Sequence, residues 1–166
     1  MPMPDYILAS QLVMAKIYLG IGVAEEPMGS NAGFWVEEMQ EDAGINKGDA
    51  WCMAGVFSCH LEGCRNQRRQ KPYLKRTGWC KGQWLWAHES PKLTVIGRDQ
   101  IINGWQIPDG AIWIKVREDG TGHCGFVYDH DPKKNEMKSI EFNHGNKADW
   151  DTYLISNIAD FQGVII

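Results

Sequence analysis

The sequence contains neither a long apolar run nor an excess of basic charge. No stretch approaches the ~18 apolar residues that cross a bilayer, and residues 1–5 lack the basic and apolar regions of a secretory signal. We therefore expect a chain without a membrane span, synthesised in the cytoplasm without a signal peptide. The 17 basic and 21 acidic residues give a net charge of −4, which argues against a general nucleic-acid binder. No internal repeat is evident, and 166 residues predict a single domain over residues 1–166.

The cysteine pattern lacks the spacings of a zinc site. There is no Cys-x-x-Cys and no pair of histidines three to five residues apart, only the loose pair Cys59 and Cys64. Five cysteines in a chain without a signal do not suggest a disulfide framework. We expect no metal and no cofactor.

The sequence has a basic segment and many tryptophans, and each of these features has two interpretations. Between Leu61 and Gly82 the chain has seven basic residues and one acid. The segment 65–76 is either a solvated loop or a surface for an anionic polymer. Eight tryptophans fill a core or line a groove for sugars or peptides.

The hydrophobic pattern predicts helices first and strands afterwards. We expect helices over 6–19, from a cap at Ser30 or Asn31 to about 41, and over 50–57 after a cap at Asp49. Residues 63–104 show no clear pattern. Strands are expected over 111–116, 122–128, 137–143 and 161–166. This order predicts the α+β class, with an antiparallel meander at the end of the chain.

Two residues could carry nucleophilic chemistry, although each has an ordinary alternative. Cys52 opens an expected helix, where unpaired N–H groups and the helix dipole favour a thiolate and could hold an oxyanion. It could equally be a small buried side chain beside Trp51. His123 begins an expected strand between small neighbours, but a single histidine is often a surface or core residue.

The expected hairpin connects His123 with possible partners. If its two strands pair around a turn near Pro132, the numbers of opposing residues sum to 265 or 266. His123 then lies opposite residue 142 or 143, with Glu141 close by. Glu141 and Asn143 are two apart and share a face. A cysteine at a helix start packed against this end would complete a set of nucleophile, base and orienting group.

Three short motifs occur in order along the chain: Gly48-Asp49-Ala50-Trp51-Cys52-Met53-Ala54-Gly55-Val56, Gly122-His123-Cys124-Gly125-Phe126-Val127 and Ile140-Glu141-Phe142-Asn143. Together they resemble the CHAP branch of the NlpC/P60 cysteine peptidases and amidases. Residues 22–33 resemble the N-terminal part of phage-type cell-wall hydrolases in that group. The resemblance covers most of residues 20–146. It implies a papain-like fold in which N-terminal helices pack on a C-terminal antiparallel sheet.

The resemblance also implies an activity and a site. The activity is hydrolysis of an amide bond in peptidoglycan, as an endopeptidase or an N-acetylmuramoyl-L-alanine amidase, without a cofactor. Cys52 matches the nucleophile, His123 the base and Glu141 the group that orients the histidine, while Asn143 matches a further polar residue at the catalytic site. The substrate-binding residues that it implies are Glu25, Asn31, Trp51 and Trp84.

Several features depart from the family or leave its partners open. Ala111 stands where an Asp is common, Cys124 replaces an aliphatic residue, and segment 65–76 has no counterpart. The loop 46–49 has too few carboxylates for calcium. Bacterial peptidoglycan is the expected partner, reached by phage-type or secretion-system delivery with a delivery or immunity partner. A glycan- or peptide-binding module without activity, and a peptidase or transferase acting on protein, remain alternatives.

Overall fold

The computed structural model describes residues 3–166, which form five α-helices, one short 3₁₀ helix and one sheet of six antiparallel strands. The chain is therefore of the α+β class, as the sequence predicts. The elements in order are α1 (Asp5–Gly20), α2 (Phe34–Ala43), α3 (Cys52–Asn66), α4 (Cys80–Glu89), β1 (Val95–Gly97), α5 (Arg98–Ile102), β2 (Ile112–Val116), β3 (Gly122–Asp131), β4 (Glu136–His144), β5 (Lys147–Leu154), the 3₁₀ helix Ile155–Asn157 and β6 (Phe161–Ile165).

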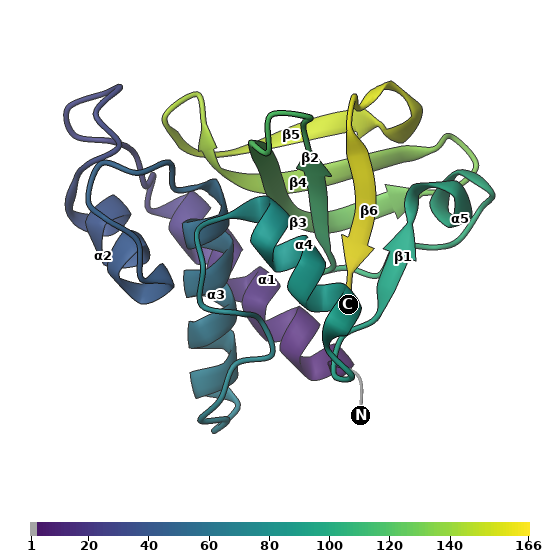
Figure 1. Ribbon diagram of the computed structural model, residues 1–166, viewed down its shortest axis with the longest axis horizontal. Helices are drawn as coiled ribbons and strands as arrows, with labels where there is room; N and C mark the ends of the chain where they lie inside the picture. Colours follow the sequence, from purple (N-terminus) through teal and green to yellow (C-terminus); the bar gives the residue numbers. More distant parts are fainter. Residues whose placement is uncertain (1–2) are drawn as a thin grey trace.

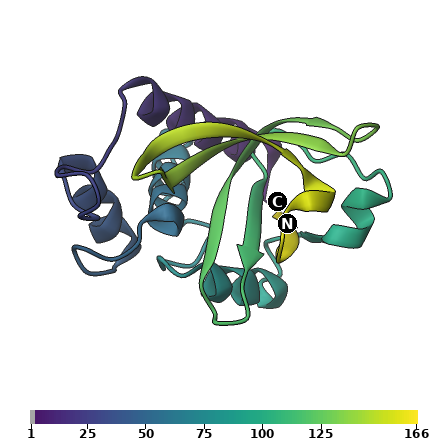
Figure 2. The same cartoon turned by 90° about the horizontal axis from the view of Figure 1, so that it is seen from above.

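The helices pack mainly on one side of the sheet. The strand order is β1-β6-β2-β3-β4-β5, and α3 packs against β3 and β4 with α1 beside it (Figure 1). Helix α2 packs on α3 at the far side from the sheet, whereas α4 contacts β2 and β3. Figure 2 shows the sheet curling strongly along β4 and β5. The start of α3 thus comes close to the central strands.

Alternating side chains of the central strands build two cores. On β2, Ile112 and Ile114 face the helices and join the larger core. Trp113 lies between them on the opposite face and joins a second core with Val127 and Phe161. This alternation is the strand period of two, and it places consecutive residues of one strand in different layers.

The helix ends differ from the predicted caps. Helix α2 begins after Gly33 rather than after Ser30 or Asn31, and α3 begins after Trp51 rather than after Asp49. The carboxylate of Asp49 instead accepts a hydrogen bond from the Asn46 N–H at 3.0 Å. These polar residues shape the loops before the helices and do not cap the helices themselves.

The register of the β3–β4 hairpin agrees, near Glu141, with the predicted pairing in which the numbers of opposing residues sum to 265 or 266. Gly125 pairs with Glu141 and Val127 with Ser139, so that opposing numbers sum to 266. A register shift follows between Val127 and Asp129. The predicted meander is confirmed there, while β5 lies in a segment that the sequence left unassigned.

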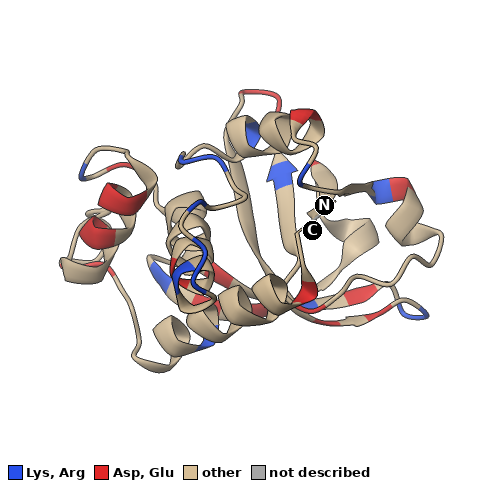
Figure 3. Ribbon diagram, turned by 90° about the horizontal axis from the view of Figure 1, so that it is seen from below, with Lys and Arg blue, Asp and Glu red and all other residues tan. Residues whose placement is uncertain are grey.

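The basic segment after α3 is a loop that is partly tied to the body of the protein. The Arg76 guanidinium donates to the carbonyl oxygens of Asp42 (2.8 Å) and Glu41 (2.6 Å), and Arg69 lies 3.8 Å from the centre of the Tyr73 ring. Figure 3 shows Lys and Arg following this loop and acidic residues on α2. Binding of an anionic polymer by segment 65–76 stays a prediction.

Across residues 3–166, none of the helices combines the length and the apolar character that spanning a bilayer requires.

Candidate active site

Cys52 is the first residue of α3, with Trp51 as its N-cap. No side chain of residues 3–166 caps this helix start. The N–H of Gly55 donates to the Trp51 carbonyl oxygen at 2.9 Å. The three N–H groups before it have no acceptor inside the helix, and they coincide with the positive end of the helix dipole. The residue Cys52 is 7% exposed, so a thiolate there is sheltered from solvent.

A buried brace holds the residue before Cys52. Trp51 is fully buried, and its indole N–H donates to Glu25 Oε1 at 2.9 Å. The other Glu25 oxygen accepts the Asn31 N–H at 3.0 Å. Trp51 and Glu25 are therefore buried, and their role in substrate binding stays a prediction. They fix the loops that lead into α2 and α3.

His123 and Glu141 meet diagonally across the β3–β4 hairpin. The distance between His123 Nε2 and Glu141 Oε2 is 2.7 Å. Glu141 pairs with Gly125, two residues beyond His123 on the same face of the sheet. A Cβ atom at Gly125 would lie only 2.7 Å from Glu141 Cγ and 2.6 Å from Ser139 Oγ. The absence of a side chain at Gly125 is thus what lets the carboxylate reach the imidazole.

Glu141 is fully buried and holds more than one partner. Its Oε2 atom also lies 3.0 Å from His144 Nδ1 and accepts the Tyr153 hydroxyl at 3.2 Å. Its Oε1 atom is buried without a hydrogen-bond partner among the described residues. The Trp113 ring stands edge-on to His123, with centroids 5.7 Å apart. The imidazole is therefore positioned by a carboxylate on one side and an aromatic wall on another.

Asn143 does not share this position, although sequence spacing put it on the same face as Glu141. The β4–β5 register shifts between Glu141 and His144, and Asn143 adopts a left-handed backbone with φ of 56°. Its amide instead donates to the side-chain oxygen of Asn31 at 3.3 Å. Asn31 and Asn143 thus join the two halves of the chain beside the site, and Glu141 alone of the two candidates bonds to His123.

Sequence reasoning missed His144 and Tyr153 as partners of Glu141. His144 reaches the carboxylate because of the register shift between β4 and β5, and no pattern in the sequence predicts this shift. Tyr153 comes from β5, where it pairs with Met137 of β4. Burial, followed by the charge of Glu141, raises the pKa of Tyr153 well above its usual value. Tyr153 therefore stays a neutral hydroxyl that can donate to the carboxylate.

The electrostatics favour a charged pair between Cys52 and His123. Interactions with Cys124 and Cys80, followed by those with His123, hold the pKa of Cys52 well below its usual value despite burial. Burial lowers the pKa of His123, but interactions with Cys52 and Glu141 outweigh it and raise that pKa to about 9. Both shifts favour a thiolate on Cys52 and an imidazolium on His123, which is the reactive form of a cysteine nucleophile.

Two further thiols surround Cys52. The sulfur atoms of Cys52, Cys80 and Cys124 all lie within 4.8 Å of one another, and the Cys52–Cys80 separation is 3.9 Å. Cys124 lowers the pKa of Cys80, but the Cys52 thiolate and burial outweigh it and raise that pKa well above its usual value. Burial, with Cys52 and Cys80, likewise raises the pKa of Cys124. Three sulfurs so close together are also a donor set for a soft metal ion.

The last predicted substrate residue, Trp84, lies half-buried on α4. Its ring stands edge-on to His88 of the same helix, with centroids 4.8 Å apart, and packs against the larger core. A role for Trp84 in substrate binding stays a prediction.

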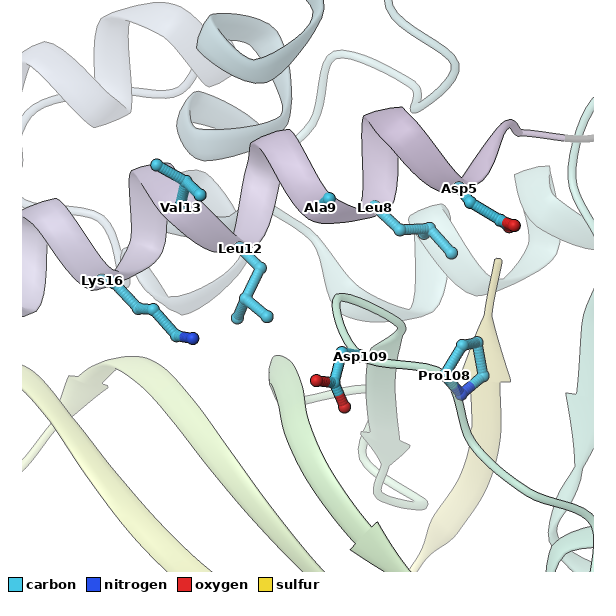
Figure 4. A pocket seen from close by; sticks show the side chains of 8 residues that line it. All are labelled: Asp5, Leu8, Ala9, Leu12, Val13, Lys16, Pro108 and Asp109. Carbon is cyan, nitrogen blue, oxygen red and sulfur yellow. The ribbon is translucent and has the colours of Figure 1, made fainter.

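A surface pocket of about 270 Å³ lies elsewhere, between α1 and the turn before β2 (Figure 4). In the close-up Leu12 and Lys16 of α1 lie on the side of Asp109, and Leu8 lies nearer to Pro108. None of the four predicted catalytic residues lines this pocket, so it is separate from the chemistry around Cys52.

Comparisons with protein-family models, with curated proteins and with solved structures gave no match for this chain. The case for a function therefore depends on the geometry of the site and on the resemblance of its motifs.

Proposed function

We propose that this chain is a cysteine-dependent amide hydrolase with Cys52 as the nucleophile. Three features support the proposal: Cys52 at a helix start, the opposed pKa shifts that Cys52 and His123 cause in each other, and the 2.7 Å contact between His123 Nε2 and the buried carboxylate of Glu141. Nucleophile, base and orienting group in series are what thiol catalysis needs.

Each residue has a defined task in this reaction. The Cys52 thiolate attacks the amide carbonyl carbon, and the free N–H groups at the start of α3 hold the oxyanion, worth roughly 3 kcal/mol per donor. The His123 imidazolium gives its proton to the departing amine, leaving a thioester on Cys52. His123 then takes a proton from the water that hydrolyses the thioester. Glu141 is a positioning residue, because it touches His123 and not the substrate.

Peptidoglycan is the proposed substrate, and a papain-like arrangement is the proposed fold. Both follow from the resemblance to the CHAP branch of NlpC/P60 enzymes. The order of helices before an antiparallel sheet, with the cysteine on a helix and the histidine on a strand, supports this assignment.

Digestion of purified peptidoglycan tests the proposal. The wild-type chain should release soluble fragments, and Cys52→Ala should release none. Cys59→Ala serves as the matched control, because Cys59 is another buried thiol of α3, and it should keep the activity. Mass spectrometry then identifies the bond: a new amino terminus on a stem or cross-bridge means an endopeptidase, and release of intact stems means an amidase. Digestion by Cys52→Ala at the wild-type rate would refute the assignment.

Alkylation separates an enzyme from a binding module without any substrate. At pH 6 an ordinary thiol with a pKa near 8.5 is less than about 1% ionised, and the other four cysteines have raised pKa values. Iodoacetamide at pH 6 should therefore label Cys52 alone. Equal, slow labelling of all cysteines would favour the binding module. Rapid labelling of Cys52 without peptidoglycan cleavage would retain the thiol enzyme and redirect the search to protein substrates.

A further inference from the structure

Two of the three clustered thiols occupy the same structural position. Cys52 is the first residue of α3 and Cys80 is the first residue of α4. Their sulfurs are 3.9 Å apart, and the two side chains belong to residues that are 7% and 3% exposed. Cys80 helps to lower the pKa of Cys52, but amide hydrolysis does not use the second thiol as a reactant.

We propose that Cys80 is a resolving cysteine, which captures Cys52 as a reversible disulfide when a hydroperoxide oxidises Cys52. Positive ends of two helices converge on this pair, and each favours the thiolate that its own step requires. A disulfide needs the sulfurs to approach from 3.9 Å to about 2.05 Å.

The reaction balances with a hydroperoxide as the only oxidant. The Cys52 thiolate attacks one peroxide oxygen, the O–O bond breaks, and Cys52 becomes a sulfenic acid while the second oxygen leaves as hydroxide and takes a proton. The Cys80 thiolate then attacks the Cys52 sulfur, the S–O bond breaks, and the oxygen leaves as water after protonation. Overall, two thiols and hydrogen peroxide give one disulfide and two waters.

The first step prepares the second. The Cys52 thiolate is one of the groups that raise the pKa of Cys80. Oxidation of Cys52 to a neutral sulfenic acid removes that negative charge, so the pKa of Cys80 falls only once there is a sulfenic acid to attack. Cys80 therefore remains a thiol beside the working nucleophile and becomes reactive after damage to it.

Cys124 is the less suitable partner, although its sulfur is also near. It lies inside β3, where it pairs with Ile114 of β2, and its sulfur already contacts Met53 Sδ at 3.8 Å. Cys80 follows a loop and has no such strand pairing. The proposal thus commits to the bond between Cys52 and Cys80.

The test uses hydrogen peroxide on the full chain and reads masses, so its outcome does not depend on any hydrolytic activity. Wild-type protein should lose two of its five free thiols, yield a Cys52–Cys80 cross-linked peptide, and recover both thiols with dithiothreitol. Cys80→Ser should instead accumulate sulfenic acid and then sulfinic acid on Cys52. Dithiothreitol does not reverse the sulfinic acid. Cys59→Ser is the matched control, because Cys59 is a buried thiol of α3 outside the three-sulfur cluster, and it should behave as wild type.

Other results would overturn the proposal. They are a disulfide between Cys52 and Cys124, equal accumulation of sulfinic acid in wild type and Cys80→Ser, and a metal ion on the three sulfurs of the purified protein, found by native mass spectrometry. Cys80→Ala provides a second substitution at this position if the serine variant fails to fold.

Discussion

Replacing Glu141 by glutamine isolates the charge of the carboxylate from its shape. Oε2 accepts from or contacts three groups, while Oε1 has no partner among the described residues. A glutamine can place its oxygen at the Oε2 position and its amino group at the unpartnered one. Glu141→Gln therefore preserves the packing and most hydrogen bonds, and removes one negative charge beside His123.

The size of the effect follows from the pKa of His123. Interactions with Cys52 and Glu141 raise it from 6.5 to about 9 in spite of burial. At 1.36 kcal/mol per pH unit, the net preference for the imidazolium is ~3 kcal/mol. If the thiolate and the carboxylate contribute equally, each supplies at least ~1.5 kcal/mol, because burial opposes both. We expect Glu141→Gln to lower the pKa of His123 by at least about one unit.

Histidine proton NMR measures this directly, because the ring signal of each histidine titrates with its own pKa. His60 will not interfere, since burial lowers its pKa to about 3. Asn143→Gly is the matched control: glycine accepts the positive φ at this position, and Asn143 bonds to Asn31 rather than to His123, so the His123 titration should not move. A pKa still near 9 in Glu141→Gln would refute the reasoning, and an equal fall in Asn143→Gly would give Asn143 the positioning role.

Two further predictions concern stability. Gly125→Ala forces a Cβ to within 2.7 Å of Glu141 Cγ and should cost ~1–3 kcal/mol in urea unfolding, whereas Gly20→Ala, with open space around it, should be close to neutral; equal midpoints would contradict the close packing. The raised pKa of His123 contributes stability that is complete below about pH 6.5 and is lost as pH rises through about 9. The lowered pKa of Cys52 contributes stability present above about pH 8.5 and lost as pH falls through its folded value. Folded and unfolded chains therefore bind equal numbers of protons on this pair between about pH 6.5 and 8.5. Relative to Cys52→Ala, the wild-type free energy of unfolding should be constant in this range and fall on both sides of it. A continuous slope of this free energy with pH would contradict the ion pair.

The parts of the site that lie on one hairpin were predictable from the sequence. A turn near Pro132 fixes the register, and the strand period of two then places Glu141 next to His123. The helix start at Cys52 was also predictable, because an apolar stretch follows a turn there. These inferences needed only local geometry. The structure confirms that Glu141 lies beside His123, while α3 begins two residues later than the predicted range of 50–57.

The remainder depended on tertiary structure. The register shift before His144 rotates Asn143 away and brings in a second imidazole. Helix α4 carries the exposed side chains of Leu85 and Trp86 as well as the buried Cys80, so its hydrophobic pattern did not indicate a helix. The burial of Trp51 came from its bond to Glu25, a residue 26 positions away, and no spacing rule anticipates such a contact.

The candidate site is divided between a helix and the sheet, and this division determines when the Cys52 thiol becomes reactive. Cys52 belongs to a helix and His123 to the sheet on which that helix docks. In an unfolded chain none of the five cysteines has the neighbours that lower the pKa of Cys52, so the proposed nucleophile forms only when α3 has docked on the sheet. If the polypeptide passes through a channel in extended form, Cys52 is unreactive during passage and becomes reactive when the chain folds afterwards.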